Sequence, residues 1–232
     1  MPNWCNNELT VKGPSEVLLA FDKAFKGKGA KWGLSDFDKY NKTPEQIAQL
    51  EKEYEEEYAT KELGYSYDAL YPIPAEVLAI GYSAPRDSRP LEQVLLDLHN
   101  PDRWVDGYSW CISHWGVKWD VGDISVYGNE EGTDELLYNF DSPWGPPVEW
   151  LEKVAKDWVE LEFTIKFEEV GCAFAGLVTF AGGEQVDEVS IDSDGYRDFV
   201  IEHFGYDPYE GYEEEDNDEE AMATPLTAMN GN

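Results

Sequence analysis

The chain has 232 residues, of which 49 are acidic and 17 are basic, so its formal net charge at pH 7 is −32. Hydrophobic residues make up 42% and aromatic residues 14%, which is more apolar material than a disordered chain carries and predicts a packed core. The charge excludes a protein that binds nucleic acid or anionic membranes directly, because an acidic surface repels both. It favours basic proteins, polyamines or metal cations as partners, unless the acidity serves only solubility or a salty cytoplasm.

The amino-terminal segment and the hydropathy pattern indicate a cytoplasmic protein. Residues 1–5 lack the basic and apolar regions of a signal peptide. No apolar run approaches the roughly 18 residues that a membrane span needs. The cysteines, Cys5, Cys111 and Cys172, are odd in number and widely spaced, which favours three reduced thiols in or near the core over a disulfide framework.

The first two predicted elements are a strand and a helix. Alternation with period two over residues 3–12 predicts a strand that ends at Gly13-Pro14, and Ser15 is the expected N-cap of the helix that follows. In each element one face is expected to lie against the core. These positions are Cys5, Asn7, Leu9 and Val11 in the strand, and Val17, Leu18, Phe21 and Phe25 in the helix.

The middle of the chain is predicted to be helical. Thr43-Pro44-Glu45-Gln46 is typical of a helix start, with Thr43 and Gln46 forming a capping box and proline at the first helical position. The apolar stripe of this helix is expected to comprise Ile47, Leu50, Tyr54 and Tyr58, opposite a face rich in glutamate. Further helices are predicted over about 88–98 and 103–115, the second ending at Gly116.

In the second half of the chain, strands are predicted at 124–127, 136–140, 161–167, 172–180 and 185–191. Two more helices are predicted at 147–158 and 194–204. The fold class is therefore α+β, with the β-α-β-β-α-β order of a ferredoxin-like sandwich. A helical insertion at about 27–120 follows the first helix, and a C-terminal β-hairpin extends the sheet. We expect one domain over residues 1–204 and an acidic disordered tail over 205–232.

Three motifs indicate a family. They are Met1-Pro2-Asn3-Trp4-Cys5-Asn6-Asn7, Trp115-Gly116-Val117-Lys118-Trp119-Asp120-Val121, and Phe140-Asp141-Ser142-Pro143-Trp144-Gly145-Pro146-Pro147. Together they resemble the YubB-type ferredoxin-like family of phage and conjugative-plasmid accessory proteins, over roughly residues 1–192. The resemblance implies the same fold and an origin in a mobile element. Gly145 stands where the family has serine, which removes a hydroxyl that could cap the next helix or touch a ligand.

The tryptophan motifs have two interpretations. Trp115 and Trp119 could pack inward and fix the turn after a helix that ends at Gly116. Alternatively, Trp115, Lys118, Trp119 and Trp144 could form a ligand-binding surface that stacks a base or a nucleotide.

Motifs for catalysis and metal binding are missing from the sequence. Cys111 and His114 share a helical face, but no second pair of ligands completes a structural zinc site. Phosphate loops, nucleophile elbows and zinc-protease motifs are lacking too, so we expect no cofactor, no metal and no enzyme.

The leading hypothesis is a non-enzymatic accessory protein of a phage or mobile element that uses its acidity against a basic host protein. Such a protein could mimic DNA and inhibit a defence or nucleic-acid-handling protein. The alternatives are a small-ligand or nucleotide-binding domain and a phage structural component. The acidic residues assigned to partner binding are Glu51, Glu55, Glu213, Glu214, Glu215 and Asp216.

Overall fold

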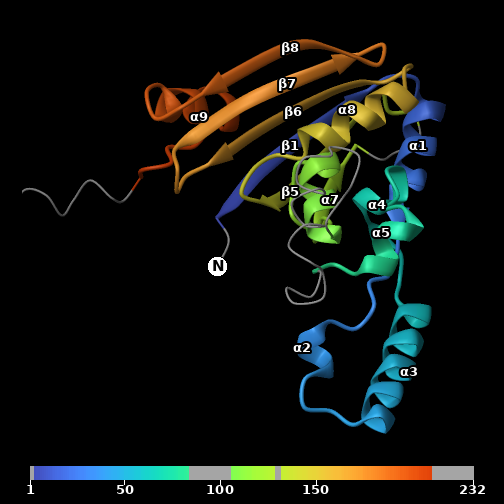
Figure 1. Ribbon diagram of the computed structural model, residues 1–232. Helices are drawn as coiled ribbons and strands as arrows, with labels where there is room; N and C mark the ends of the chain where they lie inside the picture. Colours follow the sequence, from blue (N-terminus) through green and yellow to red (C-terminus); the bar gives the residue numbers. More distant parts are fainter. Residues whose placement is uncertain (1–2, 84–105, 129–131, 211–232) are drawn as a thin grey trace, which may run out of the picture.

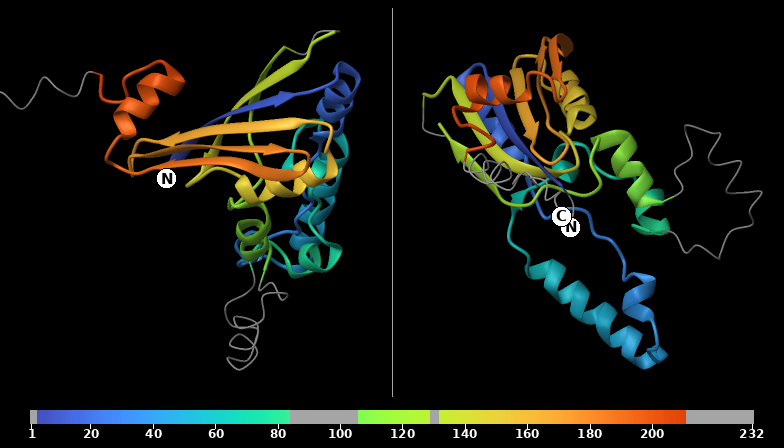
Figure 2. Two further views of the ribbon diagram at one scale, coloured as in Figure 1. Left: turned by 90° about the horizontal axis from the view of Figure 1, so that it is seen from above. Right: turned by 90° about the vertical axis from the view of Figure 1, so that its left-hand side faces the viewer.

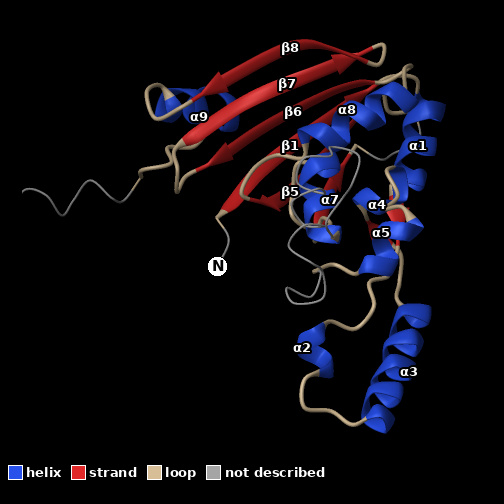
Figure 3. Ribbon diagram, viewed as in Figure 1, coloured by secondary structure: helices blue, strands red, loops and turns tan. Residues whose placement is uncertain are grey.

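The computed structural model describes residues 3–83, 106–128 and 132–210. In this part of the chain six strands form one antiparallel sheet, in the order β4-β5-β1-β6-β7-β8. The strands β5, β1, β6, β7 and β8 can be followed side by side in Figures 1 and 3. The strands of this sheet are β1 (Trp4–Lys12), β4 (Ile124–Tyr127), β5 (Glu135–Pro143), β6 (Glu162–Glu169), β7 (Phe174–Ala181) and β8 (Glu184–Ile191). The helices are α1 (Ser15–Ala24), α2 (Asp36–Lys39), α3 (Pro44–Thr60), α4 (Tyr67–Leu70), α5 (Ala75–Ile80), α7 (Gly107–Trp115), α8 (Val148–Asp157) and α9 (Tyr196–Phe204).

The strand order confirms the predicted α+β, ferredoxin-like fold. β1, α1, β4, β5, α8 and β6 follow one another along the chain as β-α-β-β-α-β, and β1 pairs antiparallel with both β5 and β6. β7 and β8 form the predicted hairpin extension beside β6. The predicted insertion lies between α1 and β4, and in its described part it adds no strand to this sheet. The strands of that described part are the two-residue β2 (Lys26–Gly27) and β3 (Gly64–Tyr65), which pair with each other.

The main core lies on the face of the sheet that α1 and α8 cover. The predicted inward positions of β1 are all buried, and so are Leu18, Phe21 and Phe25 from the first helix. Ser15 is not the N-cap that we expected. Pro14 holds that position, and no side chain accepts a hydrogen bond from the first turn.

α9 covers part of the opposite face. Its residues Phe199 and Val200 form a second core with Ala175 and Leu177 of β7, which alternate with the residues that face the main core. Figure 2 shows α9 (red-orange) against the sheet. Residues 205–210, which we assigned to the tail, contact this region, since the Tyr206 hydroxyl donates a 2.7 Å hydrogen bond to the buried Glu168 carboxylate. The rest of the predicted tail lies outside the described residues.

α2 and α3 form an arm that projects away from the sheet (Figures 1 and 2). The capping box of α3 is confirmed, because Thr43 N donates to Gln46 Oε1 over 2.8 Å and Gln46 N donates back to Thr43 Oγ1 over 3.4 Å. None of the α3 residues is buried, so its predicted apolar stripe is only partly covered.

The other helices of the insertion are described in part. The helix predicted over about 88–98 lies outside the described residues. α7 occupies the end of the helix predicted over 103–115 and stops at Gly116, which has a left-handed φ of 77° as expected. Among the described residues no helix combines the length and the hydrophobicity needed to cross a bilayer.

Candidate functional site

Exposed tryptophans from all three sequence motifs gather at one end of the sheet. Trp4 begins β1, and its cross-strand partner is Pro143, the residue before Trp144. Trp119 lies in the segment that leads from α7 to β4, and its ring contacts that of Trp4. Trp4, Trp119 and Trp144 are 50%, 38% and 48% exposed. Large aromatic side chains with this much accessible surface are unusual enough to mark a candidate binding surface.

Trp115 is not part of this surface. It is only 1% exposed, packs against Tyr67 and Trp110, and donates a 3.0 Å hydrogen bond from Nε1 to the carbonyl of Tyr71. The core interpretation therefore holds for Trp115, and its place among the ligand-binding residues is corrected. Within the same motif Trp119 faces outward, so the inward packing that we considered for both tryptophans applies to only one of them.

A buried polar network holds the Trp144 turn. The Asn7 amide donates 2.8 Å hydrogen bonds to Ser142 Oγ and to the carbonyl of Cys5, and Ser142 Oγ donates to the carbonyl of Gly145 over 2.6 Å. Trp144 has a positive φ of 74°, a conformation that a bulky residue adopts only when its surroundings impose it. Ser142 therefore supplies a hydroxyl to this turn, although Gly145 itself has none.

Lys118 and Trp144 contact each other. The Lys118 Nζ lies 4.3 Å from the centre of the Trp144 ring, within the range of a cation–π interaction. The Lys118 carbonyl accepts a 3.0 Å hydrogen bond from the Tyr82 hydroxyl, which fixes the backbone of this segment. The face of Trp144 is thus already occupied by a cation of the protein itself.

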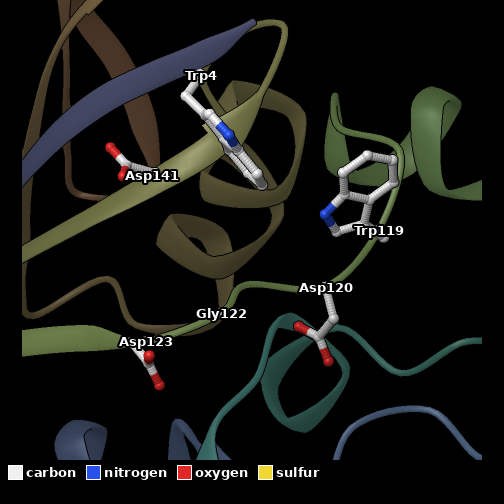
Figure 4. Close-up of a pocket in the computed structure, with 6 residues that line it drawn as sticks. All are labelled: Trp4, Trp119, Asp120, Gly122, Asp123 and Asp141. Atoms are coloured by element: carbon white, nitrogen blue, oxygen red, sulfur yellow. The ribbon is translucent and has the colours of Figure 1, made fainter. Parts of the chain in front are cut away.

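Trp4 and Trp119 form two walls of a cleft of about 320 Å³ (Figure 4). Their ring centroids are 6.3 Å apart at an interplanar angle of 75°, so the edge of one ring meets the face of the other. The remaining walls come from the segment before β4 and from β5. The residues that line the cleft are Trp4, Trp119, Asp120, Gly122, Asp123 and Asp141.

Asp120 is the carboxylate at the bottom of the cleft. Here the cleft meets the residues that connect the arm to the rest of the domain, which we call the root of the arm. It accepts hydrogen bonds from Ser66 Oγ and from the backbone of Tyr67, each over 2.6 Å, and from its neighbour Val121 over 2.9 Å. Burial raises the pKa of Asp120 to about 6, although these hydrogen bonds oppose the rise. Its side chain points away from the two rings (Figure 4), so Asp120 holds the wall rather than facing a ligand.

Asp141 lies on the face of the sheet opposite the main core. Its cross-strand neighbour Asn6 pairs on the other side with Glu168, so the two carboxylates flank one strand. Partial burial, and then the negative charge of Glu168, raise the pKa of Asp141. A bound cation would offset this repulsion, whereas a bound anion would add to it.

The chemistry of the cleft fits an organic cation. Aromatic faces attract ammonium and guanidinium groups, and the carboxylates of Asp123 and Asp141 add charge attraction. The phosphates of a nucleotide would meet the same carboxylates and be repelled, although a base could stack on the rings. This argues against the nucleotide-stacking interpretation of Trp119.

Neither thiol nor imidazole ligands gather at the cleft. Cys111 is buried in the core, and the His114 ring stacks on Trp110 at 4.4 Å. Within residues 3–83, 106–128 and 132–210, no group of three or more histidine, cysteine or acidic side chains is arranged to hold a metal ion. Cys5 is also buried, whereas Cys172, expected in or near the core, is exposed.

The acidic residues assigned to partner binding are placed only in part. Glu51 and Glu55 are exposed on α3, and Glu55 forms an ion pair with Lys31. Glu213, Glu214, Glu215 and Asp216 lie outside the described residues.

Sequence reasoning missed Trp4, Asp123 and Asp141 as members of the candidate site. Trp4 alternates with the inward positions of β1, and this predicted that it faces away from the core. Its proximity to Trp119 depends on the path of the segment between α7 and β4, for which the sequence offers no local signal.

Comparison with known proteins corrects the family. The model of the ferredoxin-like domain in Api92-like protein matches residues 114–224, just under half of the chain, and the resemblance to the YubB-type family is therefore wrong. None of the curated proteins matches the sequence. The crystal structure of protein Api92 from Yersinia pseudotuberculosis matches with a TM-score of 0.55 and 12% identity, covering 82% of this chain and 98% of that one. In its second half the chain is thus similar to Api92-like proteins, and it has the ferredoxin-like fold.

Proposed function

We propose that the protein is a non-enzymatic binding protein whose partner is a basic protein, and that it acts in the cytoplasm. The arm is the observation that carries this proposal. α3 contains six glutamates and one lysine, has no buried residue, and projects from the sheet. Beside it, Phe37 and Tyr40 are 87% and 72% exposed. An acidic helix with exposed aromatic side chains suits a positively charged partner surface, because charge complementarity guides the encounter and aromatic groups anchor it.

The finer proposal is that the partner is a nucleic-acid-binding protein and that the acidic face imitates DNA. It rests on the net charge of −32 and on the row of carboxylates along α3, which could occupy a groove made for phosphates. A phage or plasmid origin followed only from the YubB resemblance, and it is not proposed again.

The proposal is tested by capturing proteins from a cell lysate on the immobilised full chain, at about 50 mM and about 500 mM NaCl. We expect basic proteins to be captured at low salt and released at high salt, since screening weakens attraction between exposed charges. Capture that does not change with salt, or a captured set without basic proteins, would contradict the proposal.

A triple variant locates the contact on the arm. Replacing Glu51, Glu53 and Glu57 by glutamine removes three charges from α3, and we expect the dissociation constant of the captured protein to rise about tenfold or more. The matched control removes three charges from the exposed strand β8, by Glu184→Gln, Asp187→Asn and Glu188→Gln. Equal losses in both variants would assign binding to net charge alone. Competition with duplex DNA for the captured protein tests the DNA-mimic proposal.

A further inference from the structure

The cleft between Trp4 and Trp119 differs from the arm in chemistry and offers a more specific contact. On the arm, lysines accompany the glutamates, as in the pairs Lys31–Glu55 and Lys52–Glu56. Among the residues that the structure describes, the cleft is lined by two tryptophans, three aspartates and a glycine, and by no basic side chain. A site with this lining prefers a ligand group that carries positive charge and can also lie flat against an aromatic ring.

We infer that this cleft binds the cationic end of one arginine or lysine side chain of the partner. The inference rests on the proposed function, because it names the group through which a basic protein would be held. The cation would lie against an indole face, within the roughly 6 Å over which cation–π attraction acts, while Asp123 or Asp141 accepts a hydrogen bond from it.

The size of the cleft agrees with such an occupant. At about 320 Å³ it lies at the small end of ligand-binding cavities, which suits a single side chain rather than a folded element or a dinucleotide. The two rings meet edge to face at 6.3 Å, so a cation is held on a ring face and not inserted between parallel rings.

The protein contains an internal example of the same contact. Lys118, the residue before Trp119, already places its ammonium group 4.3 Å from the ring centre of Trp144. Trp144 is therefore engaged by a lysine of the chain itself, whereas the lining of the cleft combines two other tryptophans with the aspartates Asp123 and Asp141. The two neighbouring sites show how a partner lysine or arginine would be accommodated.

The cleft also adjoins the root of the arm. Asp120 in the cleft wall binds Ser66 and Tyr67, and a Cβ atom on Gly29 would lie 3.0 Å from its carboxylate. Gly29 in turn accepts a 2.9 Å hydrogen bond from Tyr58 of α3 through its carbonyl. A partner that contacts the arm near its root is thus close to the cleft, and one protein can use both.

The binding of a cation is tested with small probes on the full chain. N-acetyl-arginine amide and N-acetyl-lysine amide carry the two cations, N-acetyl-citrulline amide is the neutral isostere of the first, and spermidine is a free polyamine. Binding is followed through the indole N–H signals of Trp4 and Trp119 in nitrogen–proton NMR spectra. We expect the two cationic amides to shift both signals, with dissociation constants on the order of 1 mM, and citrulline to leave them unchanged.

Variants separate the cleft from the rest of the surface. Trp119→Ala should abolish the shift of the Trp4 signal, and Asp141→Asn should weaken it severalfold, because each removes part of the proposed contact. Tyr127→Ala, which removes a 56% exposed aromatic side chain from β4 outside the cleft, should leave binding unchanged. Equal responses to arginine and citrulline, or an unaltered response in Trp119→Ala, would overturn the inference. Binding of spermidine more than tenfold tighter than of both amides would assign the cleft to a free polyamine and also overturn it.

The captured partner distinguishes this inference from the proposed function. We expect Trp119→Ala to raise the dissociation constant of the partner about tenfold, as the loss of a tryptophan anchor does in other interfaces. If the α3 glutamine variant loses the partner while Trp119→Ala keeps it fully, the cleft inference fails and the proposed function stands. If the cationic amides bind the cleft but the chain captures no basic protein, the proposed function fails and the cation site remains.

Discussion

Asp120 shows how one side chain can serve both the fold and the site. Its carboxylate accepts hydrogen bonds from Ser66, Tyr67 and Val121, which joins the segment before β4 to the start of α4. The same position is poorly solvated, and burial raises its pKa to about 6. The charged form is therefore less favourable in the folded protein than in the unfolded chain, where an aspartate has a pKa near 3.8.

This pKa has a consequence for stability that Asp120→Asn tests. A raised pKa means that the folded state binds the proton more tightly, so the contribution of Asp120 is most favourable below about pH 4 and is lost as the pH rises to about 6. Between pH 4 and pH 7 the free energy of unfolding of the wild type should fall, relative to that of the variant, by up to about 3 kcal/mol. Urea denaturation across this range measures the difference. Asp123→Asn is the control, and parallel pH profiles for wild type and Asp120→Asn would contradict the prediction.

Single-residue predictions succeeded where a local pattern decides the outcome. Alternation along β1 placed Cys5, Asn7, Leu9 and Val11 in the core, and all four are buried. The motif at the end of α7 contains Trp115 and Trp119, and no local pattern separates them. Trp115 belongs to the last turn of α7 and packs into the core, whereas Trp119 follows after the left-handed Gly116, where the path of the chain depends on tertiary contacts.

α3 illustrates an element whose stability depends on its own sequence more than on packing. It buries none of its 17 residues, so little apolar area holds it in place. Local interactions take over part of this role. Gln49 donates a 2.7 Å hydrogen bond to Glu53 one turn away, and Thr43 caps the first turn.

Thr43→Ala should therefore loosen α3 without unfolding the domain. We expect a local cost of about 1 kcal/mol, because the variant removes the acceptor for Gln46 N–H at the first turn. Amide hydrogen exchange should speed up severalfold along the first half of α3 while strands β1 and β6 keep their protection. Glu51→Ala, on the exposed face of α3 and outside the cap, serves as the control. A uniform loss of protection across the whole protein would show that α3 is coupled to the core.

The strands of the large sheet and helices α1, α3, α8 and α9 were predicted within a few residues, with errors at their ends, whereas the short elements α2, α4, α5, β2 and β3 of the insertion were not predicted. Ser15 has the right residue type for an N-cap, but the helix begins on it and Pro14 takes that position. The last helix begins at Tyr196 rather than at Asp194, after Gly195 with a left-handed φ of 91°. Helix ends depend on the backbone conformation of one or two residues, and side-chain preference is only a partial guide to it.

The charge of the whole molecule limits its stability. Seventeen basic residues cannot neutralise 49 acidic ones, and several of the lysines already form ion pairs within helices or between neighbouring strands, such as Lys12–Glu135 and Lys153–Asp157. The excess negative charge repels itself more strongly in the compact state than in the unfolded chain.

Salt should therefore stabilise this protein. Raising NaCl from about 10 mM to about 500 mM shortens the screening distance from roughly 30 Å to less than 5 Å, and we expect the melting temperature to rise by several degrees. Differential scanning calorimetry measures the change. The β8 variant with three charges removed should show a smaller increase, and a melting temperature that falls with added salt would contradict the argument.

At this scale the sequence was sufficient for the fold class and the charge, but not for the site. The order of strands and helices predicted the ferredoxin-like arrangement, because few topologies accommodate a β-α-β-β-α-β chain. The cleft could not be predicted from the sequence, because Trp4, Trp119 and Asp141 come from segments more than 20 residues apart. Their approach depends on the register of β1 with β5 and on the irregular segment between α7 and β4.

The position of β1 in the middle of the sheet has a consequence for the speed of folding. Leu9 pairs with Tyr138 on one side and with Ile165 on the other, so the first strand of the chain depends on partners that are synthesised far later. Closing such long loops lowers the entropy of the chain before strand pairing contributes any favourable free energy. Chains rich in contacts between distant residues therefore fold slowly. A nascent chain that has reached only the end of the arm exposes Leu9 and Val11 without either neighbouring strand. Its folding is therefore a late event, for which chaperones that shield apolar segments would be useful.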